Sequence, residues 1–582
     1  MSKLNIDQKS IKALFSDKKA DFLIPDYQRP YAWGEKECQT LWDDLFAFAF
    51  PENIYGECDP EAFNTDEEYY LGPIVTFKNN GQLEVIDGQQ RLTTLMLLLR
   101  AFYSKFGKMS AQNIRKLKES IEQCIWKLNE DEEVLYDELK ISSDVATDND
   151  KDEFLEILKT GEIKSGYKSI YAKNFKFFQD KIDTYKEDYP EYFSKLPKRI
   201  LDNCILLPIE AESQDTALRI FSTLNDRGKP LSDADIFKAQ FYKFYSSIDK
   251  KDEFIKQWKT LEEKCENLFH PIVGTPMDDL FTRYMYYERA KQGIKSSTTE
   301  ALRRFYEKNS YALLKKEETL LNLIDLADFW FDVDAQNADR FSDEVLRDLF
   351  ILNYAPNGMW NYFVSVYYMK YRDSKGFLDN VMFDKFLNKI IAFIWGYAII
   401  RPGVNALRTP VFAEMVNIVN DKEVTFSEFL FEESHMKNSI ENYQFGNNRA
   451  ITKSMLTWWT FQNEHQELLD LDTVIEIEHI FARNRQEKEH ALTDSRKLEC
   501  LGNKSLLEKR INIRASDYRF EDKIKYYKGY TTDRGQVKEA TKIRELLQLA
   551  DSYSDFNEKN IDDRNESIID GFIKYLNENK LF

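Results

Sequence analysis

The sequence predicts an α+β protein that is predominantly helical, with three domains at residues 1–245, 246–440 and 441–582. The first segment mixes short apolar runs with helical stretches, the second has an almost entirely helical pattern, and the third contains a strand, a loop, a second strand and a helix. Only 20 Gly and 14 Pro occur in 582 residues, which favours long helices over flexible linkers.

Residues 1–245 alternate between strand and helix signals. The short apolar runs Leu83–Gly88 and Asn203–Ala211 are bounded by turn-forming residues, as buried strands are. The segments Cys38–Phe50 and Leu92–Tyr103 have the length and composition of helices. We therefore expect a mixed α/β domain in this part of the chain.

The first candidate site lies where the predicted strand at residues 83–88 meets a helix. The chain runs from Asp87 and a glycine directly into Gln89, Gln90 and Arg91. Free N–H groups at a helix N-terminus bind anions, and an arginine adds a planar fork for phosphate. Asp87 is suited to holding a cation or positioning a water. The alternative is a capped helix with an exposed arginine. A P-loop is excluded because GxxxxGK[ST] is absent.

Two further polar segments share this character. Residues 24–33, IPDYQRPYAW, gather aromatic residues around Arg29. Residues 221–232, FSTLNDRGKPLS, form a polar glycine loop, and Ser232 or Asp233 is suited to cap the following helix. The candidate residues of this loop are Asn225, Arg227 and Gly228.

Residues 246–440 show helical periodicity, for example at 254–269 and 320–333. The aromatic stripe at Trp360–Arg372 has helical spacing, which favours core packing over a cofactor site. The longest strongly apolar run, Ile390–Ile400, is shorter than the ~20 residues that a membrane span needs, so it predicts a buried helix. The N-terminus lacks the apolar core of a signal peptide, and the six cysteines form no CxxC, so we expect a cytoplasmic protein with free thiols and no membrane partner.

The charge distribution predicts where nucleic acid can bind. The net charge of −19 opposes binding of phosphate by the protein as a whole, so a nucleic-acid site must be a local exception. Residues 479–528 carry 13 Lys and Arg against 8 Asp and Glu, a net charge of +5. This basic island marks either that site or a solvated helical face.

The C-terminal segment contains a strand–loop–strand–helix order. Thr473–Ile480 alternates and is rich in β-branched residues, which predicts a strand ending in a Glu-His pair. Cys500–Leu507 predicts a second short strand, opened by Gly502-Asn503. A helix is predicted from Ser516, with apolar positions at Phe520, Ile524 and Tyr527.

This order carries residue types suited to phosphodiester cleavage. Histidine is the side chain suited to abstracting a proton from water near neutral pH, and carboxylate and amide oxygens are ligands that Mg²⁺ and Mn²⁺ accept. Glu478 and His479 would point to opposite faces of a regular strand, so they share one site only if the strand ends or twists there. A core histidine beside a strand-end glutamate is the alternative.

Glu478-His479-Ile480, residues 501–507 (LGNKSLL) and Asn512 together resemble the HNH, or His-Me finger, nuclease domain of the GmrSD family of modification-dependent (type IV) restriction enzymes. The resemblance implies a ββα-metal fold for residues 441–582. It also implies that His479 is the general base and that Asn503 holds the loop and orients His479. Glu478 and Asn512 would be ligands of Mg²⁺ or Mn²⁺.

The N-terminal segments IPxYQRPYxW, IDGQQRLTTL and FxxLNxRGxxLS, with the LGxI strand at residues 71–74, resemble the DGQQR domain of the same family. That domain is similar to the ParB fold and is associated with nucleotide binding and hydrolysis. The resemblance implies an NTP site, with Asp87 acting on a metal or a water. The residues lining it would be Arg29, Asp87, Gln89, Gln90, Arg91, Asn225, Arg227 and Gly228.

Taken together, the two resemblances predict an NTP-regulated, metal-dependent DNA endonuclease of anti-phage defence, with modified phage DNA as its partner. The helical middle would transmit the nucleotide state. Two alternatives stay open: a nucleotide-sensing module that binds DNA without cutting it, and a scaffold subunit of a larger defence complex. The DNA modification, the preferred NTP, nicking against double-strand cleavage, and assembly as a homo-oligomer are open as well.

Overall fold

The computed structural model describes residues 5–6, 8–49, 67–107, 109, 112–145, 148–164, 166, 168–214, 216–217, 220, 232–401, 403 and 406–582. The chain forms two compact units, residues 1–260 and 261–582. The predicted α+β, predominantly helical class is confirmed, since helices dominate both units and a small mixed sheet lies in the first. The domain boundaries at residues 245 and 440 stay predictions.

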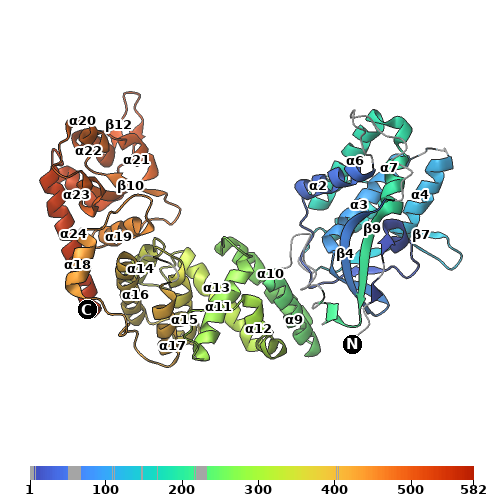
Figure 1. The fold of residues 1–582 in the computed structure, drawn as a ribbon, viewed down its shortest axis with the longest axis horizontal. Coiled ribbons are helices and arrows are strands. Elements are labelled where there is room, and N and C mark those ends of the chain that lie inside the picture. The colour runs from blue at the N-terminus through green and yellow to red at the C-terminus, as the bar shows by residue number, and fades with distance from the viewer. Residues whose placement is uncertain are drawn as a thin grey trace. The chain divides into compact units, whose positions relative to one another are not determined.

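The first unit is built around a mixed sheet that has seven strands among the described residues (Figure 1). Its order is β1-β9-β4-β5-β3-β8, with β2 also paired to β9. In the middle, β4 pairs parallel with β9 and antiparallel with β5. A separate hairpin joins β6 and β7. The strands are β1 (Asn5–Ile6), β2 (Lys9–Ser10), β3 (Phe22–Ile24), β4 (Tyr69–Asn79), β5 (Gln82–Asp87), β6 (Trp126–Leu128), β7 (Val134–Leu139), β8 (Ile141–Ser143) and β9 (Cys204–Ala211).

Helix α3 is the centre of this unit. Its residues are apolar nearly all round from Leu92 to Phe102, so every side of the helix is buried against the sheet or its helical neighbours. The predicted strands at residues 83–88 and 203–211 are confirmed as β5 and β9. Ser232 forms the predicted cap, in a capping box with Asp235. The helices are α1 (Ile11–Phe15), α2 (Glu35–Ala49), α3 (Gln89–Phe106), α4 (Gln112–Ile125), α5 (Lys151–Thr160), α6 (Ile170–Asp188), η2 (Pro190–Tyr192), α7 (Lys195–Asn203), α9 (Asp233–Ser247) and α10 (Lys251–Leu268), which continues into the second unit.

The second unit begins with an array of helices, green to orange in Figure 1. The predicted buried helix at residues 390–400 is confirmed within α16, where Phe393 stacks on Phe426 with centroids 3.6 Å apart. The aromatic stripe of α15 packs in the core as predicted, with Tyr368 stacked on Phe329. No helix in the described ranges has the length and hydropathy of a membrane crossing. These helices are α11 (Pro276–Lys291), α12 (Leu302–Tyr311), η3 (Ala312–Leu314), α13 (Glu317–Asp334), α14 (Asp343–Leu352), α15 (Met359–Tyr371), α16 (Asn380–Ile400), α17 (Arg408–Val419), α18 (Glu433–Glu441) and α19 (Ala450–Phe461).

The rest of the second unit holds the predicted strand pair, confirmed as the antiparallel strands β10 and β11. The predicted helix start at Ser516 is wrong. Ser516 has a φ of 45°, in the left-handed region, so it ends one helix, and the next begins at Phe520. The elements are β10 (Ile475–His479), α20 (Arg483–Glu489), η4 (Ser495–Glu499), η5 (Leu501–Asn503), β11 (Lys504–Glu508), α21 (Lys509–Ala515), α22 (Phe520–Lys528), β12 (Tyr530–Thr531), β13 (Val537–Lys538), α23 (Arg544–Ser552) and α24 (Glu558–Glu578).

Candidate functional site

The predicted nuclease residues lie on β10 of the antiparallel strand pair β10–β11, on η5 just before β11, and on α21 just after it. In the strand register His479 pairs with Lys504, and Glu478 pairs with Ser505. Strand β10 ends at His479, which is one of the two arrangements that would let Glu478 and His479 share a site. Their side chains nevertheless have different partners, as expected for successive residues of a strand.

His479 is nine-tenths buried and lies beside a carboxylate. Its Nε2 is 3.5 Å from Glu499 Oε1, an electrostatic contact, and has no hydrogen-bond partner among the described residues. Burial, with the charges of Lys504 and Arg483, lowers the pKa of His479 to about 4 against the opposing effect of Glu499. The imidazole is therefore neutral at neutral pH, which is the state that a general base needs.

Glu499 links the histidine to two cations. One carboxylate oxygen accepts a hydrogen bond from Arg483 at 2.6 Å, and the other accepts one from Lys504 Nζ at 2.6 Å. The Lys504 side chain is fully buried and also donates to Asn447 Oδ1 at 2.7 Å. The imidazole thus faces a carboxylate whose own charge is already balanced.

Asn503 fixes the chain just after His479. Its Oδ1 accepts a hydrogen bond from the Phe481 N–H at 2.7 Å, and its Nδ2 donates to the Phe481 carbonyl at 3.2 Å. The Asn503 carbonyl accepts from the Ile480 N–H at 2.9 Å. The residue is completely buried and fixes the backbone after His479, with no described bond to the imidazole itself. Its role in orienting His479 stays a prediction.

Helix α24 supports the turn that carries Asn503. Arg564 donates from one nitrogen to the carbonyls of Leu501, Gly502 and Lys504 at 2.7 to 3.1 Å. A Cβ on Gly502 would lie 2.1 Å from the carbonyl oxygen of Ile561, so only glycine permits the helix to approach this closely. The Leu501-Gly502-Asn503 sequence therefore reflects packing against α24.

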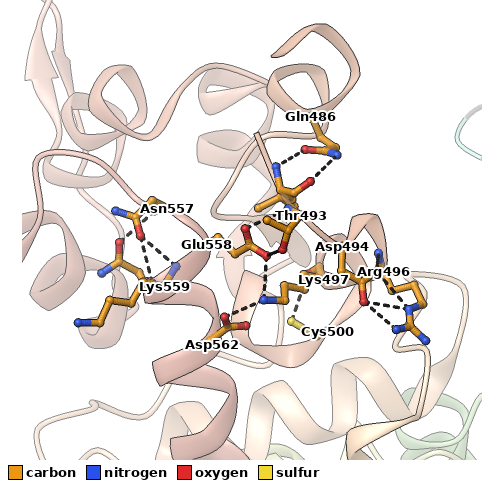
Figure 2. Close-up of polar contacts among 12 residues, drawn as sticks. Gln486, Thr493, Asp494, Arg496, Lys497, Cys500, Asn557, Glu558, Lys559 and Asp562 are labelled. Carbon is orange, nitrogen blue, oxygen red and sulfur yellow. Dashed lines mark hydrogen bonds and ion pairs between the residues drawn. The ribbon is translucent and has the colours of Figure 1, made fainter. Parts of the chain in front are cut away.

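The segment before Glu499 is tied to the same helix (Figure 2). Lys497 Nζ lies 2.8 Å from Glu558 and 2.7 Å from Asp562. The Thr493 N–H and hydroxyl both donate to Glu558, at 3.0 and 2.5 Å. The bonds from Lys497 and Thr493 lower the pKa of Glu558 to about 2. This cluster anchors the loop that brings Glu499 to His479.

The predicted metal ligands are held apart by other partners. Glu478 is 3% exposed, and its Oε1 accepts from Tyr527 OH at 2.6 Å and lies 2.8 Å from Lys523 Nζ. Burial raises the pKa of Glu478, which Lys523 opposes. Asn512, on α21, donates to Glu476 Oε2 at 2.9 Å.

The side chains at this position do not form a site for a divalent ion. The described residues contain no group of three His, Cys, Asp or Glu side chains arranged to hold a metal. Glu478 Oε1 is already engaged by an ammonium and a hydroxyl. As arranged here, Glu478 and Asn512 do not fit Mg²⁺ or Mn²⁺, so their role as ligands stays a prediction.

The basic island, residues 479–528, is partly neutralised by acids outside it. Arg485 pairs with Asp555, and Lys497 pairs with Glu558 and Asp562. Exposed cations do lie on α21, where Lys509 and Arg510 precede Asn512. The positive surface next to the candidate centre is therefore smaller than the sequence count suggests.

In the first unit, Asp87 and two arginines come together where β5 meets α3. Burial raises the pKa of Asp87, and the Gly88 N–H and the charges of Arg91 and Arg29 act in the opposite direction. Gly88, with a φ of 91°, makes the turn into the helix. Asp87 thus interacts electrostatically with both Arg91 and Arg29.

Arg91 is 8% exposed and anchored to the neighbouring strand. Its NH1 donates to the Pro73 carbonyl at 2.9 Å. A Cβ on Gly72, whose φ is 119°, would lie 2.9 Å from the guanidinium, which explains the glycine of the LGxI strand. Arg91 is a buried, oriented side chain, and the alternative of an exposed arginine is wrong.

The two glutamines of this motif hold the segment at residues 29–33. Gln90 Oε1 accepts from the N–H groups of Ala32 and Trp33 at 2.7 and 3.2 Å, and its Nε2 donates to the Pro30 carbonyl at 3.1 Å. Gln89 Nε2 donates to the Arg29 carbonyl at 3.3 Å. The segment at residues 24–33 and the segment with Gln89 and Gln90, two of the three predicted segments, therefore pack together through these hydrogen bonds. Asn225, Arg227 and Gly228 lie outside the described residues.

Sequence reasoning missed four residues that support the candidate centre, namely Glu499, Lys523, Tyr527 and Arg564. For Lys523 a signal existed. It shares one helical face with Phe520 and Tyr527, and the structure buries it, whereas the predicted core position Ile524 is only half-buried. A lysine on the apolar face of a helix marks a buried acidic partner.

Two family models match the chain. The one described as the GmrSD restriction endonuclease N-terminal domain matches residues 11–242, and the one described as the GmrSD restriction endonucleases C-terminal domain matches residues 431–570. The chain is also similar to the uncharacterized protein MJ0686 of Methanocaldococcus jannaschii, with 25% identity over 255 residues. That alignment covers 39% of this chain and 40% of that protein, which is less than half of the relative's length.

Proposed function

The chain belongs to the GmrSD restriction endonuclease family, and on that premise we propose that it cuts DNA in anti-phage defence, with His479 as the general base. The observation that carries this proposal is the neutral imidazole at the end of β10, faced by Glu499 and followed by the loop that Asn503 fixes. A neutral imidazole has a nitrogen lone pair that can accept a proton from the attacking water.

The finer features of the nuclease rest on the resemblance. It implies an HNH domain at residues 441–582 with Mg²⁺ or Mn²⁺ at Glu478 and Asn512, whereas the present partners of these side chains leave no such site. The proposed substrate is DNA, with modified phage DNA favoured by the modification-dependent character of the family. The exposed Lys509 and Arg510 of α21 support a phosphate contact beside the centre.

We also propose that the N-terminal unit binds and hydrolyses an NTP. Asp87, Arg91 and Arg29 support this, because a carboxylate and two arginines at a helix N-terminus suit a nucleotide phosphate and its water. Gln89 and Gln90 would contribute by holding the segment that carries Arg29. Asn225, Arg227 and Gly228 complete the proposed site, and residues 246–440 would relay the nucleotide state.

The nuclease proposal is tested by cleavage of matched plain and modified phage DNA, with Mn²⁺ and with or without each NTP. His479→Ala should abolish cutting while leaving the fold intact, which circular dichroism checks. His465→Ala, an exposed histidine of the same unit, serves as the matched control. Cutting by His479→Ala at the wild-type rate would refute the assignment of the base.

The same assay separates the alternatives. A regulatory module or a scaffold subunit binds DNA but leaves plasmid intact under every metal and nucleotide condition. The nucleotide assignment is tested by phosphate release, which Asp87→Ala should reduce strongly without altering Mn²⁺ binding by the C-terminal unit. Unchanged turnover would overturn the N-terminal part of the proposal and leave the nuclease part standing.

A further inference from the structure

A buried lysine lies at the candidate nuclease centre. The side chain of Lys523 is 1% exposed, and its Nζ is 2.8 Å from Glu478 Oε1. The same nitrogen donates to the carbonyl oxygen of His479 at 2.6 Å. One ammonium group therefore contacts both Glu478, which the resemblance makes a metal ligand, and His479, which it makes the general base.

Helix α22 delivers this lysine. Phe520 and Tyr527, three residues before and four after Lys523, are buried, so the helical period places all three side chains on one face. Tyr527 OH donates to the same Glu478 oxygen at 2.6 Å. A charge and a hydroxyl from one helix thus converge on one carboxylate.

The chemistry of Glu478 Oε1 and of the His479 carbonyl oxygen explains why the Lys523 ammonium contacts both. A buried carboxylate needs a counter-charge, and Lys523 supplies it. The oxygens that the ammonium contacts, a carboxylate and a backbone carbonyl, are also the ligand types that Mg²⁺ and Mn²⁺ prefer. A lysine ammonium and a divalent ion repel each other, so they compete for these oxygens.

We infer that Lys523 is a tethered cation at Glu478, and that a divalent ion binds this carboxylate only when the Lys523 ammonium is displaced. The inference rests on the proposed function, which places the chemistry at this hairpin. It assigns Lys523 as a positioning residue that keeps Glu478 and the His479 carbonyl in place while no metal is bound. The Lys523 ammonium lowers the affinity of the centre for free metal.

The first test measures Mn²⁺ binding by the full metal-free chain without DNA, using calorimetry. Lys523→Met keeps the length of the side chain and removes its charge, and it should bind Mn²⁺ at least tenfold more tightly than the wild type. Lys525→Met, at an exposed position of the same helix, should bind as the wild type does. Adding Glu478→Gln to Lys523→Met should abolish the gain. Equal or weaker binding by Lys523→Met overturns the inference.

A second test uses the wild-type chain and decides the matter even if Lys523→Met fails to fold. Lysines are acetylated with a succinimidyl ester, with and without saturating Mn²⁺, and the peptides are quantified by mass spectrometry. Displacement predicts that acetylation of Lys523 rises several-fold with Mn²⁺, while that of Lys525 stays constant. Unchanged protection of Lys523 overturns the inference.

Both measurements are made without DNA, so their outcome is separate from that of the cleavage assay. If His479→Ala cuts plasmid at the wild-type rate, the proposed function fails whatever the Mn²⁺ data show. If His479→Ala is inactive and Lys523→Met binds Mn²⁺ no better than wild type, the function stands and only the tethered cation fails.

Discussion

The side-chain amide of Asn503 holds the backbone of Phe481 on both of its polar groups, accepting from the N–H at 2.7 Å and donating to the carbonyl at 3.2 Å. Both residues are buried, at 0% and 1% exposure, so no water replaces these bonds. The loop after His479 is therefore fixed by one side chain from the opposite strand end.

Asn503→Ala should destabilise the second unit and abolish cleavage. Each buried backbone group left without a partner costs roughly 1–3 kcal/mol, and two such groups arise at Phe481. Urea unfolding measures the loss, with Asn442→Ala as an exposed control at a helix end. A change in stability no larger than that of the control would contradict the structural role.

Gly502→Ala should also destabilise the second unit, for a steric reason. The added Cβ would meet the Ile561 carbonyl oxygen at 2.1 Å and Asn565 Cβ at 2.6 Å, so α24 must move away from the hairpin. Overpacking of this kind costs about 1–3 kcal/mol or more. Gly358→Ala, where the nearest atom is 3.7 Å away, is the matched control. Equal unfolding midpoints for the two variants would show that the close approach is absent in solution.

Glu558 should contribute stability that depends on pH. Its pKa falls from an ordinary value of 4.5 to about 2 in the folded chain, because Lys497 and Thr493 bond the carboxylate. The stabilisation is therefore full above about pH 5 and is lost as the pH falls toward 2. Glu558→Gln should lower the unfolding midpoint at pH 7, and its difference from wild type should shrink below pH 5. A difference that does not vary with pH, or one equal to that of the exposed Glu566→Gln, would argue against the cluster.

Gln90→Ala should weaken the first unit and the proposed nucleotide site together. The variant removes three bonds to residues 30–33, each worth about 1 kcal/mol, and releases the segment that carries Arg29. Thermal unfolding and nucleotide binding should both decline. Gln39→Ala loses only an exposed bond to Asp43 within α2 and should change neither.

The fold was accessible to sequence reasoning where its signals are local. The hairpin strands, the turn at Gly88 and the cap at Ser232 follow from neighbouring residues, and the structure has them in place. The break between α21 and α22 was missed because the left-handed conformation of Ser516 has no glycine to announce it.

The partners of the candidate residues were beyond that reasoning, because they come from distant parts of the chain. Glu499 reaches His479 across a loop, and Lys523 reaches Glu478 from a helix whose apolar period suggested Ile524 instead. The charge count of residues 479–528 likewise left out distant partners. Asp555, Glu558 and Asp562, which pair with cations of that segment, lie later in the chain.

The packing of α24 against the turn at Gly502 has a consequence for folding during synthesis of the chain. Arg564 and Ile561 follow the turn at Gly502 by some sixty residues, so they leave the ribosome well after His479 has emerged. Until then the turn lacks the Arg564 guanidinium, which donates hydrogen bonds to three of its carbonyl groups. A nascent chain thus carries His479 in a loop that α24 does not yet support, and the candidate centre is complete only after α24 has docked.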